Sequence, residues 1–290
     1  MRGGMRLLTN LKLIMKTFIV PTDFSPEAEN ALEYACAVAG VLRARLVLFN
    51  SYSFPVHASN ARLSAASMES LEEHNKELLQ ERAQRLSTQC NIQISYEYGL
   101  MVEVSEELDK IVEKYQGDMV IMGMAPKSLA QELFGNTTTS VIMKQKYPVL
   151  AVPSGATYSG LKKILFACDD LEKVPKNILT RIREMAAVLE AEVEVFHVKT
   201  KSNSWAVAAT TPASSSVIDE GFEGISYYYK NVESTAVIAA IEQEVKNIQA
   251  DLLIMMPRRY GFWDSFAHRS KTRMMASNND VPLLSIPVQS

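Results

Sequence analysis

The amino-acid sequence contains two copies of one unit of about 140 residues. Three pairs of short segments recur in the same order: KTFIVPTD (16–23) with KKILFACD (162–169), DMVIM (118–122) with DLLIM (251–255), and YPVLAVP (147–153) with VPLLSIP (281–287). Such a repeat decides the architecture, because both copies are expected to fold alike. A segment rich in Ser and Gly separates the copies. We therefore expect an N-terminal extension (1–14), a first domain (15–153), a linker (154–160) and a second domain (161–290).

Each copy alternates apolar runs with amphipathic helical patterns. In the first copy the sequence predicts strands at Thr17–Pro21, Leu46–Asn50, Ile92–Tyr98, Met119–Gly123 and Val149–Val152. In several of these runs apolar and polar residues do not alternate strictly, as is typical of strands buried on both faces of a parallel sheet. Ser25 suits the N-cap and Pro26 the first position of the helix that follows the first strand. Alternating strands and helices indicate an α/β fold with two tandem doubly wound, Rossmann-like domains, each with a five-stranded parallel sheet.

The second copy departs from the first in one segment. Where the first copy has a charged helical pattern, residues 201–222 of the second have little periodicity and many Ser, Thr and Ala residues. We expect a loop there, with at most a short helix.

Composition excludes several classes of protein. The chain has 30 Lys and Arg against 33 Asp and Glu, and this net charge of −3 argues against a nucleic-acid partner. No apolar run approaches the roughly 18–20 residues that span a membrane. Lys12 interrupts the apolar N-terminal stretch, which argues against a signal peptide, and Met15 is an alternative start. We expect a cytoplasmic protein.

Cysteines and histidines give no metal or disulfide pattern. The three cysteines lie far apart, which is neither a disulfide framework nor a CxxC pair and suits a reducing compartment. The four histidines are dispersed, so we expect no metal site built from protein ligands and no catalytic residues of a known motif.

Three segments of the first copy are expected to meet at the carboxyl edge of the sheet, where open α/β sheets bind ligands. The first strand ends in Thr22 and Asp23, whose carboxylate either accepts hydrogen bonds from a ligand or caps the next helix. The second strand ends near Ser51, where the backbone either contacts a ligand base or turns into a loop.

The third segment follows the fourth predicted strand. Met122 and Gly123 end that strand, and the glycine indicates a close approach of the backbone to another group. Small and hydroxyl residues then precede a helix, at Gly135, Asn136, Thr137 and Thr138. A helix N-terminus of this kind favours a phosphate, because free N–H groups and the helix dipole both attract anions. Alternatively, Gly135 forms a turn and the next residues only cap the helix.

These segments together resemble the universal stress protein (UspA-like) family, in two tandem copies over nearly the whole chain. The resemblance implies an adenine nucleotide alpha hydrolase-like α/β fold, a cytoplasmic location and dimerisation through the last strand. The ATP-binding branch of the family has an aspartate after the first strand and the motif G-x2-G-x9-G-[ST]. Asp23 matches that aspartate, and Gly123 and Gly135 match the first and third glycines. The resemblance therefore implies ATP with Mg²⁺ in the first domain.

Both copies depart from this motif. In the first copy, Pro126 replaces the second glycine of the motif. Eight residues instead of nine then separate this position from the third glycine, Gly135, and Asn136 replaces the Ser or Thr that follows it. In the second, Met256, Arg259 and Arg269 occupy the glycine positions, and large side chains there are expected to fill the phosphate site. Basic residues gather in the same loop, 258–273, either as an anion or acidic-partner site or as a solvated loop.

Three functions remain open at this point. The first is a sensing or scaffolding module of the stress response that is not an enzyme and binds an adenine nucleotide in its first domain only. The second is a weak ATPase, and the third is an interaction protein with both pockets closed. In each case the last strands, 148–152 and 282–286, are expected to dock on each other within one chain, imitating the family dimer and protecting exposed sheet edges. A homodimer of the whole chain also remains open.

Overall fold

The computed structural model describes residues 16–52, 65–100, 104–124, 137–144, 146–168, 170–199, 215–256 and 281–288. The first half contains β1 (Thr17–Pro21), α1 (Pro26–Leu42), β2 (Arg45–Tyr52), α2 (Ala65–Cys90), β3 (Ile94–Leu100), α3 (Val104–Tyr115), β4 (Met119–Met124), α4 (Thr137–Lys144) and β5 (Val149–Pro153). The second half contains β6 (Lys163–Cys168), the 3-10 helix η3 (Leu171–Lys173), α5 (Lys176–Leu189), β7 (Glu192–Lys199), α6 (Ser215–Gly221), β8 (Ser226–Glu233), α7 (Val237–Ile248), β9 (Leu252–Met255) and β10 (Leu283–Ser285).

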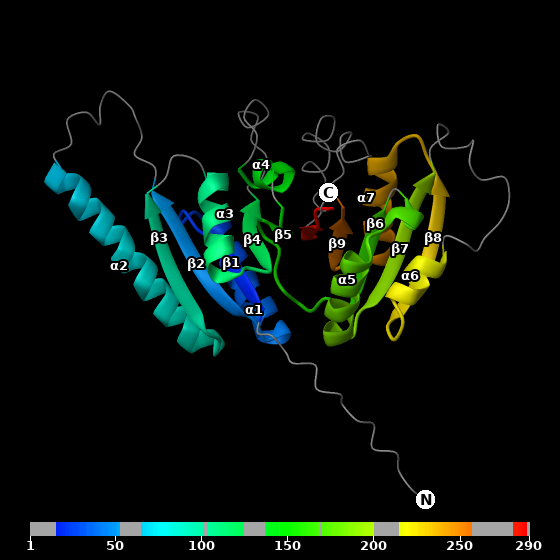
Figure 1. Ribbon diagram of the computed structural model, residues 1–290, viewed down its shortest axis with the longest axis horizontal. Helices are drawn as coiled ribbons and strands as arrows, with labels where there is room; N and C mark the ends of the chain where they lie inside the picture. Colours follow the sequence, from blue (N-terminus) through cyan, green and yellow to red (C-terminus); the bar gives the residue numbers. More distant parts are fainter. Residues whose placement is uncertain are drawn as a thin grey trace, which may run out of the picture.

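All ten of these strands form one sheet in the order β3-β2-β1-β4-β5-β10-β9-β6-β7-β8 (Figure 1). Each half repeats the same strand order, and all pairs within a half are parallel. The predicted α/β fold with five parallel strands in each half is confirmed. The two halves meet through β5 and β10, which pair antiparallel with Leu150 opposite Leu284.

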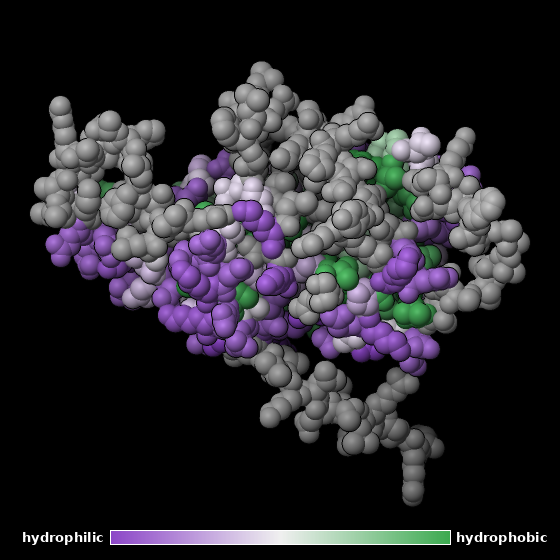
Figure 2. Space-filling model, turned by 45° about the horizontal axis from the view of Figure 1, so that its top comes forward, coloured by the Kyte–Doolittle hydropathy of each residue, from purple (hydrophilic) through white to green (hydrophobic). Residues whose placement is uncertain are grey.

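Helices cover both faces of this sheet. On one face, α1, α2, α5 and α6 bury their apolar side chains in one continuous core that runs through both halves. On the other face, α3, α4 and α7 bury theirs in a second core. Burial on both faces explains the uninterrupted apolar strands, since side chains of alternate residues enter different cores. In Figure 2 the described surface is mainly hydrophilic, with small and separate hydrophobic areas.

The predicted strands differ from the observed ones mainly at their ends. β2 is longer than Leu46–Asn50, and β3 begins at Ile94 rather than Ile92. The later start of β3 follows from the chain turn at Asn91, whose φ of 52° ends α2 in the left-handed conformation. The segment 201–222 contains the short helix α6, as predicted, while residues 201–214 lie outside the described part. Among the described residues, no helix has both the length and the apolar character needed to cross a bilayer.

The segment between the two halves packs against the first half. Ala156 and Leu161 are buried, and the Tyr158 ring contacts the Tyr34 ring edge-on, with centroids 5.5 Å apart. Burial, the neighbouring Tyr158 and then Asp251 raise the pKa of the Tyr34 hydroxyl above its usual range. Within the linker predicted at 154–160, Ala156 therefore belongs to the core and Tyr158 packs against α1, while Gly155, Thr157 and Ser159 are exposed.

Candidate functional site

The turn after β1 is held by hydrogen bonds to β2. Thr22 is buried; its N–H donates to the carbonyl of Phe49 at 2.8 Å, and its own carbonyl accepts from Nδ2 of Asn50 at 2.7 Å. The Thr22 hydroxyl oxygen accepts from the N–H of Phe24 at 3.0 Å. Thr22 therefore fixes the path of the chain where it leaves the sheet.

Asp23 lies on the surface of this turn. Its Oδ1 accepts a hydrogen bond from the N–H of Ser25 at 3.0 Å, and the residue is exposed. Ser25 is the N-cap of α1, because its hydroxyl accepts from the N–H of Ala28 at 3.2 Å. Of the two roles predicted for Asp23, the helix cap thus belongs to Ser25, and Asp23 stabilises the turn while its carboxylate faces solvent.

Phe24, between these two residues, has a φ of 62°. This left-handed conformation is unfavourable for an aromatic residue and is often found beside functional sites. The Phe24 ring packs against the core, and its N–H is bonded to Thr22, so local contacts hold the strained turn. The bonds from the N–H groups of Phe24 and Ser25 thus hold the turn that carries the Asp23 carboxylate.

Gly123, near the end of β4, lies directly against α1. A Cβ at this position would come within 2.3 Å of the carbonyl oxygen of Glu27 and 2.6 Å of its carbonyl carbon. The close approach predicted from the sequence is therefore an approach to the backbone of a helix of this chain, which a side chain would prevent. Met122, one residue earlier, is buried in the core.

The N-terminus of α4 is tied to the same point of β4. Thr138 is buried, and its hydroxyl donates to the carbonyl of Gly123 at 2.7 Å. Thr137, the first residue of α4, is exposed. Gly135, Asn136 and Pro126 lie outside the described residues.

The strand order places the ends of β1 and β4 next to each other. β1 lies between β2 and β4. The helices that lead to β2 and β3 (α1 and α2) cover one face of the sheet, and those that lead to β4 and β5 (α3 and α4) cover the other, so the topological switch point of the first half lies between β1 and β4. Asp23 follows β1, and Thr137 begins the helix tied to β4. Ser51, on β2 opposite Gly99 of β3, is one strand further away.

The second half reproduces part of this arrangement. Nδ1 of His197 lies 3.1 Å from the carbonyl of Cys168, at the positions that correspond to Asn50 and Thr22. Because a carbonyl only accepts, the proton of this bond is on Nδ1. Asp170 caps η3 through a bond from the N–H of Glu172 at 3.1 Å. Asp169 and the basic loop 258–273 lie outside the described residues.

Sequence reasoning missed the pairing of Asn50 with Thr22. Asn50 ends a buried strand, and a buried amide at that place needs a backbone partner, which is the signal that identifies it. Within the ranges that the structure describes, no three His, Cys, Asp or Glu side chains lie close enough together to hold a metal ion.

The strand order and the helices on both faces define a tandem α/β protein of the Rossmann-like type. A model of the universal stress protein family matches residues 15–153. Universal stress protein G of Escherichia coli O157:H7 is 28% identical over 144 residues, covering 47% of this chain and 98% of that protein. Residues 15–153 therefore form a universal stress protein domain.

Solved structures extend the similarity of the fold to both halves. A universal stress protein from Archaeoglobus fulgidus has a TM-score of 0.69 at 19% identity and covers 93% of this chain and 96% of its own. A putative universal stress protein from Pseudomonas aeruginosa has a TM-score of 0.55 at 13% identity, covering 96% and 95%. The tandem Rossmann-like fold predicted from the repeat is therefore a known arrangement.

Proposed function

We propose that this chain is a sensing module of the stress response that binds an adenine nucleotide, ATP with Mg²⁺, in its first half only. The nucleotide occupies the crevice between the ends of β1 and β4. In this role the chain binds the nucleotide and does not catalyse a reaction. Cytoplasmic location is part of the proposal, and the three cysteines, all free thiols, are consistent with it.

The observation that carries this proposal is the pair of features on either side of the crevice. Asp23 has an exposed carboxylate after β1, and the Thr138 bond to Gly123 ties the N-terminus of α4 to β4, the strand next to β1. A carboxylate accepts hydrogen bonds from ribose hydroxyls or a base amine, and a helix N-terminus favours phosphate. The two features thus suit the two ends of a nucleotide.

The residues fit the nucleotide through Asp23 and the start of α4. Gly123 contributes indirectly, because its missing side chain allows α1 and β4 to lie side by side and so sets the width of the crevice. Mg²⁺, when bound with ATP, neutralises phosphate charge that this acidic turn would otherwise repel.

The second half acts in this proposal as a built-in partner. The pairing of β5 with β10 buries the edges that two separate domains would expose, and it resembles the pairing of two subunits. We therefore propose an intramolecular pseudo-dimer, with a first domain over 15–153, a linker over 154–160 and a second domain over 161–290. In this arrangement the second domain is a scaffold, with large side chains at its glycine positions.

Calorimetric titration with Mg-ATP tests the nucleotide site. We expect the wild-type chain to bind one nucleotide per chain, and Asp23→Ala to reduce the affinity at least about tenfold, because it removes a charge-assisted hydrogen bond. Asp169→Ala is the matched control, since Asp169 follows Cys168 as Asp23 follows Thr22 in the repeat. This variant should bind as the wild type does.

Three outcomes would count against the proposal. Equal losses in Asp23→Ala and Asp169→Ala would assign the effect to general destabilisation, and absence of binding would leave a nucleotide-free interaction protein. Steady release of phosphate during the titration, abolished by Asp23→Ala, would favour the weak ATPase instead.

A further inference from the structure

A buried glutamate of β7 takes the place that a buried valine has in the first half. In each half the second strand of the sheet begins opposite the first residue of the central strand. The third residue of β7, Glu194, therefore corresponds to the third residue of β2, Val47. Both side chains are buried, and Glu194 is only 1% exposed. An ionisable group has thus replaced an apolar one inside the second core.

The helix that covers this position carries a second such replacement. Glu244 of α7 lies seven residues before Asp251, and Ile111 of α3 lies seven residues before Asp118, so the two correspond in the repeat. Glu244 is 3% exposed. The apolar pair of the first half, one residue on a strand and one on a helix, is therefore a pair of carboxyl groups in the second half.

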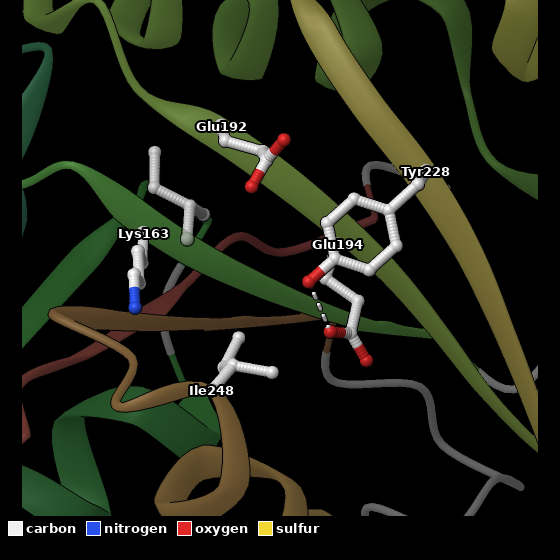
Figure 3. Close-up of a pocket in the computed structure, with 6 residues that line it drawn as sticks. Lys163, Glu192, Glu194, Tyr228 and Ile248 are labelled. Atoms are coloured by element: carbon white, nitrogen blue, oxygen red, sulfur yellow. Dashed lines mark hydrogen bonds between the residues drawn. The ribbon is translucent and has the colours of Figure 1, made fainter.

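Hydrogen bonds satisfy most oxygens of this pair. The Tyr228 hydroxyl donates to Oε2 of Glu194 at 2.7 Å, as Figure 3 shows. Nζ of Lys230 donates to both oxygens of Glu244 at 2.7 and 2.6 Å, and Nδ2 of Asn247 donates to Oε2 at 3.2 Å. Oε1 of Glu194 is buried and receives no hydrogen bond.

Two ionised carboxylates would be unfavourable here. The Glu244 carboxyl lies within hydrogen-bonding reach of Glu194, and Lys230 supplies one positive charge for two negative ones. Burial raises the pKa of Glu194, as do the charge and hydrogen bond of Glu244, against the opposing effects of Tyr228 and Lys230. A proton on Oε1 removes both difficulties, because the hydroxyl it creates donates to Glu244.

We infer that Glu194 and Glu244 form a proton-binding site that fastens α7 to β7 and β8 when one proton is bound and loosens this contact when the proton leaves. The polar and charged groups that surround it come from every neighbouring element: Lys163 of β6, Glu192 of β7, Tyr228 and Lys230 of β8, and Asn247 of α7. A cavity of about 180 Å³, lined by Lys163, Ile164, Glu192, Glu194, Tyr228 and Ile248, lies beside Glu194 and provides a path for proton exchange (Figure 3).

The direction of the pH response follows from the neutral form of Glu194. A carboxyl whose folded-state pKa is raised stabilises the fold fully below the unfolded value of about 4.3. That contribution is lost as the pH rises through the folded-state pKa. The contact of α7 in the second half is therefore expected to loosen as the pH rises from about 4.3 through the folded-state pKa of Glu194.

Hydrogen exchange of the α7 amides, measured between about pH 5 and pH 9 on the full chain, tests this inference. Wild type is compared at each pH with Glu194→Gln, whose amide donates to Glu244 at every pH. The ratio of opening constants, wild type over variant, should rise by up to tenfold per pH unit until Glu194 is ionised. Glu192→Gln is the control, because Glu192 is exposed, lines the same cavity and lies on the same strand.

A ratio that stays constant with pH would overturn the inference, as would the same pH response in Glu194→Gln as in wild type. Glu192→Gln should keep the wild-type response, and loss of the response there would move the site away from the pair. If Glu194→Gln does not fold, a ¹³C NMR titration of the Glu194 carboxyl in the wild-type chain decides. A midpoint near the ordinary glutamate value of about 4.3 would overturn the inference, and a raised midpoint would support it.

Discussion

Asp118 and Thr17 bind each other through two hydrogen bonds. The N–H of Asp118 donates to the carbonyl of Thr17, and Oδ2 of Asp118 accepts from the N–H of Thr17, both at 2.8 Å. Asp251 makes the same pair of bonds with Lys163, at 2.8 and 2.9 Å. The aspartates that mark the internal repeat in the sequence therefore have one structural role, which is to join the start of the fourth strand of each half to the start of the first.

Removing these carboxylates should destabilise the fold. Asp118→Ala leaves the half-buried N–H of Thr17 without its acceptor and should lower the free energy of unfolding by about 1.5–3 kcal/mol. Asp251→Ala should cost more, because Oδ2 of Asp251 also accepts from the N–H of Lys162 at 2.8 Å. Urea denaturation measures both, and Asp118→Asn, which keeps a carbonyl oxygen as acceptor, is the control. Equal stability of Asp118→Ala and wild type would refute the assigned role.

Gly123→Ala should be strongly destabilising. Its Cβ would collide with the Glu27 backbone, and moving α1 away from β4 should cost about 3 kcal/mol or more. Gly40→Ala is the matched control, because Gly40 lies within α1 and a Cβ there meets no atom within 4 Å. That variant should gain about 0.5–1 kcal/mol from helix propensity. Thermal unfolding of the two variants distinguishes these effects, and similar melting temperatures would contradict the close packing.

Glycine should be favourable at the end of α5. Glu190 is the C-cap, with a φ of 50°, and its side chain is 86% exposed. Glu190→Gly relieves the left-handed conformation and should stabilise the fold by about 0.5–1 kcal/mol. Glu190→Ala keeps the Cβ, so it measures the loss of the exposed ion pair with Lys162 alone, which should be small. No gain for glycine over alanine in urea denaturation would be the contrary result.

Asp219 should control the titration of Tyr227. The hydroxyls of Tyr227 and Tyr229 donate to Oδ1 of Asp219 at 2.7 and 2.8 Å. The hydrogen bond to Asp219, followed by burial and the negative charge of Asp219, raises the pKa of Tyr227 to about 12. This contribution to stability is present below the ordinary tyrosine value of about 10 and is lost as the pH rises through 12.

The difference in tyrosinate absorbance between wild type and Asp219→Asn measures this effect. The variant should ionise at lower pH, because an amide does not repel the phenolate as a carboxylate does. Superimposable titration curves would show that Asp219 does not hold these hydroxyls in solution.

The fold could be predicted because the internal repeat indicates two similar domains and the apolar runs indicate their strands. The apolar strands and the aspartates at 118 and 251 recur in the same sequence order in both copies, so each copy supports the elements predicted in the other. The ends of elements could not be predicted as well. Asn91, Gln116 and Gln249 all turn the chain in the left-handed conformation, where glycine is the usual signal.

The candidate site could be predicted in part. The sequence indicates Asp23 and Gly123, but it does not show that α1 is the group against which Gly123 packs, since that contact joins distant segments. The burial of Glu194 and Glu244 could not be predicted from the sequence either. Glu194 alternates with valines in EVEVFHVK, which is the pattern of a half-exposed strand, and only the covering helix buries it.

The most direct test of the nucleotide site is a crystal structure of the full chain grown with Mg-ATP. We predict one nucleotide per chain, in the crevice between β1 and β4, with an Asp23 carboxylate oxygen within about 3.2 Å of a ribose hydroxyl or base nitrogen and the phosphates toward the start of α4. A nucleotide bound elsewhere on the chain, or an empty crevice at saturating Mg-ATP, would contradict the proposed function.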